Sequence, residues 1–432
     1  MIRSLVPLFA LLLSDALVLL GHGLLLTLLP ITAGSLGFSD VQIGLTGSSY
    51  FVGFVAGCLL TPIVLMRVGH IRTFAVVAAC YAVMTLIFAW SQSFYVWLML
   101  RFTIGAMIAG IYMIIESWLN ERADPHLRGG ILSFYAMMNL LMITLAQQLL
   151  NFGSSNALFL FALASICLSL AIIPVSLTLS LAPSPVKTVK VDFNKVWRHS
   201  RIGILGSICT GFITGSFWSL APVFGNGNGF DAFQMANFMS AVVLGGAIFQ
   251  IPLGRISDRF DRRAVLICIA VGGALLSLLT FVVSSLPLYK GVVSTVLAFF
   301  WGGMGMTMYA ICLAHANDNA KSEDFVDIGS AMLITYGLSS AIGAMIASVF
   351  MGALGPAYLF VFMALSFTAF CIILIVRRKA HVLPLTTEQN EEFQAVAGMT
   401  TPEAFHLDPR SELIENASKG ADNKTPETQN GD

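Results

Sequence analysis

Hydrophobic residues in this chain gather into twelve long runs separated by polar gaps. A helix needs roughly 20 apolar residues to cross the hydrocarbon core of a bilayer. The runs that meet this length are residues 5–31, 41–66, 73–92, 96–119, 129–151, 156–181, 202–224, 233–254, 264–286, 290–316, 328–351 and 356–376. They predict an all-α membrane protein with 12 transmembrane helices, most of them antiparallel to their neighbours. Ser39, Asp40 and Asp231 precede the second and eighth runs and are expected as helix caps or first-turn acids.

A repeat with an offset of 192 residues divides the chain into two halves. The matching residues are Pro30 and Pro222, Gly37 and Gly229, Gln42 and Gln234, Gly53 and Gly245, and Arg67 and Arg259. A fixed register of this kind indicates duplication of one half. We therefore expect two pseudo-symmetric six-helix bundles, residues 1–181 and 202–379, joined by a cytoplasmic linker at 182–201.

Two segments lie outside the predicted bundles. The linker mixes basic and apolar residues around Trp197, which fits either a short helix on the membrane surface or a flexible connection. Residues 380–432 carry 3 basic and 10 acidic residues, a net charge of −7. This polar tail is predicted to be cytoplasmic and mostly disordered.

Composition and the positions of basic residues indicate environment and orientation. Hydrophobic residues make up 57% of the chain and charged residues 11%, against about 25% charged residues in soluble domains. With the N-terminus inside, the even gaps and both ends hold 18 Lys and Arg residues, whereas the odd gaps hold one. The positive-inside rule then predicts a multi-pass protein of the cytoplasmic (inner) membrane with both termini inside. The first run is too long for a signal peptide and is interpreted as a retained span.

Ionisable residues well inside the runs are rare and fall on the first, fourth and tenth spans. They are Asp15, His22, Arg101, Glu116 and His315. An ionisable group in lipid is costly, so each should face a cavity or a partner. Asp15 lies roughly 15 Å into its helix, near the membrane centre. His22 follows on nearly the same face, so the pair is a candidate for proton exchange. The alternatives are a permanently paired structural ion at Asp15 and a structural hydrogen bond at His22.

Arg101, Tyr112 and Glu116 form one stripe on the fourth span. Arg101 is a candidate to bind an anionic group or to shift the pKa of Asp15. The alternative is that it snorkels to the membrane surface. Glu116 is expected to form a gating ion pair with Arg128 or another cytoplasmic basic residue, with proton transfer as the second interpretation. Tyr112 and Trp218 are candidate walls for a ligand, and an interfacial position explains His315.

The segment from Gly254 to Arg263 places four arginines in a short gap between two runs. It resembles the turn motif of the major facilitator superfamily through Gly254, Asp258, Arg259, Arg262 and Arg263, with Asp261 where a glycine is usual. A poorer copy retains Arg67, Gly69 and a displaced Arg72, but lacks the aspartate. Leu98, Arg101 and Gly105 match a second family pattern. Within the superfamily, the stretches Gly47–Phe51, Ile114–Trp118 and Ala314–Asp318 are most similar to the YcaD-like branch of putative transporters.

The resemblance implies that spans 1, 4, 7 and 10 line a central cavity and that the two bundles rock about it. Asp258 would then face the N-terminal end of the fifth span and hold the inner side closed. Arg259, Arg262 and Arg263 would latch onto acids or lipid phosphates. The alternative for these turns is topology anchoring alone.

Other classes of protein lack their motifs in this sequence. No Walker A loop, His-Glu-x-x-His or Gly-x-Ser-x-Gly pattern occurs, and no two of the seven cysteines form a Cys-x-x-Cys pair. We expect a monomeric, non-enzymatic secondary transporter without metal, cofactor or nucleic acid. Its partners would be the lipid bilayer, a small organic solute and protons, with export favoured over import. A receptor or sensor built on a transporter shell is the alternative.

Overall fold

Twelve helical spans make up the protein in this computed structural model. The structure describes residues 8–122, 128–153, 156–177, 196–198, 200–286, 290–318, 320, 324–380, 393 and 400–407. The first half contains α2 (Phe9–Ser35), α3 (Asp40–Val68), α4 (His70–Trp90), α5 (Phe94–Arg122), α6 (Arg128–Gln148), η3 (Leu149–Gly153), α7 (Ala157–Leu170) and α8 (Ile172–Ser176). The second contains α10 (Arg201–Gly227), α11 (Ala232–Arg259), α12 (Arg262–Ser284), α13 (Lys290–Gly305), α14 (Met308–Asn317), α15 (Phe325–Leu354) and α16 (Tyr358–Ala380). The predicted number of spans is confirmed for the described residues.

Two predicted spans are interrupted. The sixth span breaks between α7 and α8 at Ala171, three residues before Pro174, which lacks an N–H and crowds the preceding turn. The tenth span breaks between α13 and α14, directly after a glycine-rich stretch that ends at Gly305. Hydropathy alone predicts neither break.

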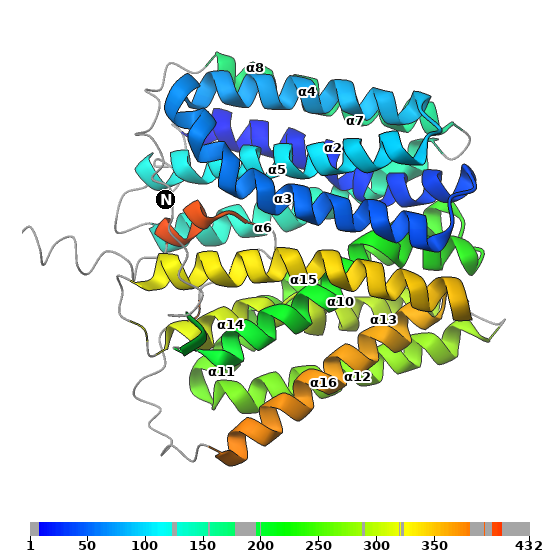
Figure 1. Ribbon diagram of the computed structural model, residues 1–432, viewed down its shortest axis with the longest axis vertical. Coiled ribbons are helices and arrows are strands. Elements are labelled where there is room, and N and C mark those ends of the chain that lie inside the picture. Colours follow the sequence, from blue (N-terminus) through cyan, green and yellow to red (C-terminus); the bar gives the residue numbers. More distant parts are fainter. Residues whose placement is uncertain are drawn as a thin grey trace, which may run out of the picture.

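The two halves lie side by side as two helical bundles (Figure 1). Contacts between the halves run chiefly between α3 and α15 and between α6 and α11, with α10 also touching α2 and α3. The helices α3, α6, α11 and α15 therefore form most of the boundary between the halves.

The predicted repeat is visible as matched local geometry. Ser39 and Gln42 form a capping box at the start of α3, and Asp231 and Gln234 form the equivalent box at the start of α11. Gly37 and Gly229, in the turns just before, have φ angles of 83° and 77°, values that glycine adopts without steric cost. The expected caps are therefore confirmed, in both copies.

The glycine pair Gly53 and Gly245 shows why the repeat keeps a small residue in the helix interior. A Cβ added to Gly53 would overlap the carbonyl oxygen of Phe102 on α5, and one added to Gly245 would overlap that of Phe299 on α13. Both glycines thus permit a close approach of two helices, α3 to α5 and α11 to α13.

We expect Gly245→Ala to lower the melting temperature of the purified protein, because the added methyl has no room against backbone. Overpacking of this kind costs about 1–3 kcal/mol. Gly34→Ala is the matched control, since the nearest atom to its added Cβ would be 3.9 Å away. Equal melting temperatures for the two variants would contradict the close-approach interpretation.

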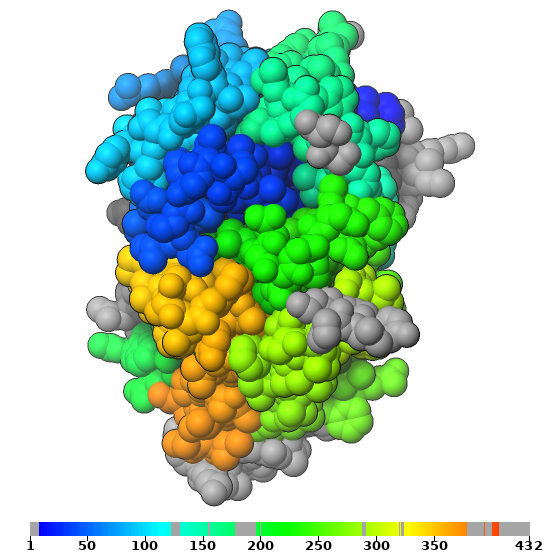
Figure 2. All heavy atoms as spheres, turned by 90° about the vertical axis from the view of Figure 1, so that its right-hand side faces the viewer, coloured from blue at the N-terminus to red at the C-terminus, as the bar shows by residue number. Residues whose placement is uncertain are grey.

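The two ends of the bundles differ. The arginine-rich end, defined by the turns Arg67–Arg72 and Gly254–Arg263, is the end at which η6 (Pro402–Leu407) lies (Figure 1). At the opposite end the halves are tightly joined. A Cβ on Gly44 would overlap Ser348, and one on Gly47 would overlap Ser219. Figure 2 looks onto this end and shows atoms of the first half (blue) directly against atoms of the second (green and orange).

Hydrogen bonds across the halves reinforce this closure. Ser48 Oγ donates to the carbonyl of Ala341 at 2.6 Å, and Gln148 Nε2 donates to Ser240 Oγ at 2.8 Å. The structure is therefore closed at the end opposite the arginine turns.

The linker and the tail are described only in part. Residues 196–198 are helical, with Val196 buried and Trp197 41% exposed, which leaves the surface helix a prediction. In the tail, Phe393 and 400–407 are described, and the expectation of disorder otherwise falls outside the described residues. The bundle boundaries 1–181 and 202–379 remain predictions.

Candidate functional site

Asp15 lies on α2 and is completely buried. With the Asn139 amide oriented to satisfy its surroundings, its NH₂ donates to Asp15 Oδ2 at 2.9 Å and to the carbonyl of Tyr135 at 3.1 Å. Asp15 Oδ1 has no hydrogen-bond partner among the described residues. A buried carboxyl with one unpaired oxygen is costly as an anion. Burial therefore favours the protonated form of Asp15 in this conformation.

A second buried carboxyl lies in the same bundle. Glu116 on α5 is completely buried, and its Oε1 likewise has no partner in the described part of the chain. Electrostatic interactions join Glu116 to Asp15, and both carboxyls to Tyr112 and Tyr135. The first half therefore concentrates two acids and two phenols between α2, α5 and α6.

His22 and Arg101 form a neighbouring polar cluster with two tyrosines. The Nδ1 atom of His22 lies 2.6 Å from Tyr81 Oη, and its Nε2 atom lies 3.2 Å from Tyr50 Oη. Arg101 is 3% exposed, and its guanidinium lies 5.0 Å from the centre of the Tyr50 ring, a cation–π distance. Arg101 therefore points into the bundle instead of snorkelling to the surface.

Glu116 meets an unexpected partner. Its Oε2 accepts hydrogen bonds from the backbone N–H of Thr401, at 2.9 Å, and from the Thr401 hydroxyl. The expected partner, Arg128, starts α6, but its side chain lies outside the described residues. The ion pair between them thus stays a prediction.

Of the three remaining candidates, Tyr112 and Trp218 are buried and His315 is partly exposed. Tyr112 is 2% and Trp218 is 7% exposed, and Trp218 packs edge-on against Phe217. His315 lies near the end of α14, with Nδ1 3.7 Å from Asp318. Their roles as ligand walls, or as an interfacial residue for His315, stay predictions.

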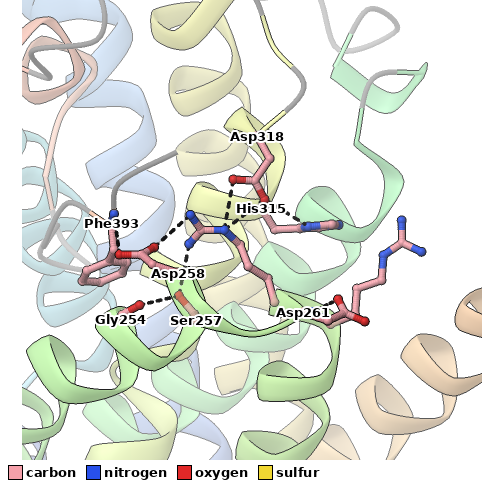
Figure 3. Close-up of polar contacts among 9 residues, drawn as sticks. Gly254, Ser257, Asp258, Asp261, His315, Asp318 and Phe393 are labelled. Atoms are coloured by element: carbon pink, nitrogen blue, oxygen red, sulfur yellow. Dashed lines mark hydrogen bonds and ion pairs between the residues drawn. The ribbon is translucent and has the colours of Figure 1, made fainter. Parts of the chain in front are cut away.

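The arginine turn of the second half is built around one buried side chain, Arg262, and Figure 3 shows its surroundings, with Ser257, Asp258 and Asp318 labelled. Its guanidinium contacts Asp258 at 3.0 Å, Asp318 at 3.0 Å and Ser257 Oγ at 3.1 Å. Asp261, where the family motif has glycine, caps α12 by accepting from the N–H of Arg263 at 2.9 Å. Arg262 therefore ties α11, α12 and the end of α14 together.

Asp258 also contacts the tail, because its Oδ2 accepts from the N–H of Phe393 at 3.0 Å (Figure 3). Gly254 lies beneath the Phe393 ring, which would overlap a Cβ there. The expected contact of Asp258 with the start of α6 is absent from the described contacts, and the side chains of that first turn lie outside them.

The other motif residues lie at the surface or in a turn. Arg67, Arg72 and Arg259 are exposed, and Gly69 joins α3 to α4 with a φ of 83°.

Several site residues escaped the sequence interpretation. Tyr81, Asp318, Phe393 and Thr401 all contact a predicted residue. A tyrosine and an aspartate inside or just after an apolar run are visible signals, whereas no pattern in the tail marks Phe393 or Thr401.

Comparisons with known proteins agree with this architecture. The chain is 26% identical over 374 residues to the uncharacterized MFS-type transporter YcaD of Escherichia fergusonii, covering 86% of this chain and 96% of that protein. It is 27% identical over 380 residues to YcaD of Escherichia coli O17:K52:H18, with the same coverage.

Two solved transporters share the fold. The nucleoside transporter NupG superposes with a TM-score of 0.71 at 12% identity, covering 86% of this chain and 98% of NupG. A bacterial homologue of the human lysosomal transporter Spinster, inward-facing and unoccupied, gives 0.66 at 15% identity, covering 95% and 97%. Residues 11–324 and 203–415 match the Major Facilitator Superfamily. The chain therefore belongs to the major facilitator superfamily, whose members are multi-pass membrane transporters and not enzymes.

Proposed function

We propose that this protein is a monomeric, proton-coupled secondary transporter that exports a small organic solute by alternating access. In this proposal it lies in the cytoplasmic membrane with both termini and the arginine-rich end in the cytoplasm. The basic residues of the even gaps support that orientation.

One observation supports the proposal of proton coupling. Asp15 and Glu116 are both completely buried, and each has one carboxyl oxygen without a described hydrogen-bond partner. Two like charges in such a place would repel and lack solvation. A proton on either carboxyl removes a charge, and release of that proton requires contact with water. The two carboxyls can thus hold a proton and release it only when movement of the bundles exposes them to water.

The closed end supports alternating access. The halves are sealed opposite the arginine turns by small residues and cross-half hydrogen bonds. Asp15 is inaccessible in this state, so the transport cycle needs a second state in which α3 and α15 separate. Rocking of two rigid bundles about a midplane site provides such a state.

The substrate class follows from the buried groups. Arg101 offers a positive charge, while Tyr112 and Trp218 offer aromatic surface. Such a set suits an amphiphilic organic solute. NupG is a transporter of nucleosides, but at 12% identity this similarity supports the fold alone.

The test begins with a thermal-shift screen of purified protein against metabolites and antimicrobials. A solute that raises the melting temperature is then labelled and offered to proteoliposomes with an imposed pH gradient. We expect solute movement against its own gradient, abolished by a protonophore. Binding without flux would contradict transport and favour the sensor alternative.

A further inference from the structure

Part of the C-terminal tail lies inside the arginine-rich end. The described residues Thr400–Phe405 lie against α5 and α6 of the first half and α15 of the second (Figure 1). All six are buried, with Thr401 at 0% and Phe405 at 5% exposure. A net charge of −7 across residues 380–432 would favour full solvation of the tail, so burial of this piece needs specific contacts.

Those contacts join the two halves of the protein. On the first half, Thr401 donates both its N–H and its hydroxyl to Glu116. On the second half, the Phe405 ring fills the space over Gly329 of α15, where any Cβ would overlap it. The short segment therefore bridges α5 and α15, which belong to different bundles.

A second contact, earlier in the tail, holds the chain against the second half before it reaches Thr400. Phe393 packs its ring on Gly254 and donates its N–H to Asp258 at 3.0 Å (Figure 3). Both anchors pair an aromatic ring with a glycine on the bundle and a backbone N–H with a buried or partly buried carboxyl. Repetition of the same two-part contact indicates a built docking surface.

We propose that Phe393 and Thr400–Phe405 form a detachable plug, which docks on Glu116, Gly329 and Gly254 and holds the arginine-rich end shut. While the plug is docked, Oε2 of Glu116 is occupied by Thr401, and α5 is tied to α15. Separation of the bundles at this end requires that the plug leave first. The plug thus acts as an autoinhibitory element of the proposed transporter, and its role rests on that proposed function.

Docking should depend on pH through Glu403. Burial raises the pKa of Glu403 from 4.5 to about 7. The docked state therefore prefers the protonated acid, so docking is strongest below pH 4.5 and weakens as pH rises from 4.5 to 7. The charged residues at the arginine-rich ends of the helices packed against this segment are Glu116, Glu121 and Arg122 on α5, Arg128 on α6, and Asp324 and Asp327 at the start of α15. Glu116 interacts directly with Glu403 as a like charge.

Hydrogen–deuterium exchange of the full chain in lipid nanodiscs tests docking directly. We expect the Thr401 amide to be protected and Gly329→Ala to raise its exchange rate at least tenfold, because the methyl expels the Phe405 ring. Its protection factor should fall at least tenfold between pH 5 and 7.5, and Glu403→Gln should remove that fall. Exchange of this amide at the unprotected rate in the unaltered chain would overturn the plug.

Reaction of Cys58 with N-ethylmaleimide tests whether the plug closes the arginine-rich end. Cys58 on α3 is 6% exposed and interacts electrostatically with Glu116, so it reports on the space behind the plug. Deletion of residues 393–432 should speed its modification at least tenfold, whereas deletion of 411–432 should not. Cys268, exposed on α12, serves as the internal control with an unchanged rate.

Equal Cys58 rates in the two deletions would overturn closure by the plug. Neither measurement needs a transported solute, so failure of the proposed transport function would leave both results interpretable. Once a solute is known, initial transport rates should rise severalfold when residues 393–432 are deleted. An unchanged or lower rate, with Thr401 still protected in the full chain, would overturn the autoinhibitory role.

Discussion

Replacement of Asp15 by asparagine is expected to reduce pH-gradient-driven transport by about 100-fold or more, while leaving the fold intact. The introduced amide has nearly the shape of the carboxyl, and its carbonyl oxygen can still accept the hydrogen bond from Asn139. It cannot take up or release a proton in the physiological range. The loss should therefore appear in coupling and not in stability.

The measurement compares two modes of transport in proteoliposomes. Solute movement driven by an imposed pH gradient should be lost, whereas exchange of labelled for unlabelled solute at equal pH should continue. Ser14→Ala is the matched control, because Ser14 is the adjacent residue of α2, is also fully buried, and its hydroxyl has no described partner. Normal gradient-driven transport by Asp15→Asn would show that another group carries the proton.

The helices and their repeat were predictable because they follow from rules local to the sequence. The length of an apolar run decides whether a helix can cross the bilayer, and Ser39 and Asp231 cap helices through contacts only three residues away. The breaks at Ala171 and after Gly305 were not predicted. Hydropathy averages over a window, so it passes over a proline or a glycine cluster inside an apolar run.

The candidate site was predictable as a set of residues but not as a set of contacts. Asp15, Arg101 and Glu116 stand out because ionisable groups are rare in lipid-facing sequence. Their partners depend on helix rotation and packing, which hydropathy does not contain. Thus Asn139 was one polar residue among several, and Tyr81 was overlooked in an apolar run, although both contact the site.

The tail shows the limit of composition as a guide. Its net charge predicts that most of 380–432 is disordered. A composition average hides a six-residue segment with a single acid, Thr400–Phe405, which is buried against both halves. The glycines on which these rings pack, such as Gly329, cannot be recognised in the sequence, because the space that they leave exists only in the folded protein.

The turn motif was interpreted as a latch between the bundles, but its buried arginine holds one bundle together. Arg262 and Asp258 are four residues apart, a spacing at which side chains meet on a helix. Asp318 comes from the end of the tenth span, 56 residues later. Arg262 thus forms ion pairs with two carboxylates within the second half, which is a structural role that anchoring in the membrane surface would not require.

We therefore expect Arg262→Gln to destabilise the protein by about 3 kcal/mol, since it breaks the ion pairs of a buried arginine with Asp258 and Asp318. Thermal unfolding in detergent measures the effect. Arg259→Gln is the matched control, because Arg259 lies in the same turn and is exposed, and it should unfold like the unaltered protein.

A charge-balanced variant separates the lost ion pair from lost packing. Adding Asp318→Asn to Arg262→Gln removes one of the two carboxylates that lose their ion pair with Arg262. The Asp318 side chain is only 10% exposed, so the double variant should recover part of the lost melting temperature. If the double variant unfolds no later than the single one, the loss comes from packing of the arginine stem. If Arg262→Gln unfolds like Arg259→Gln, the buried arginine does not stabilise the bundle, and the latch between bundles becomes the better explanation of the motif.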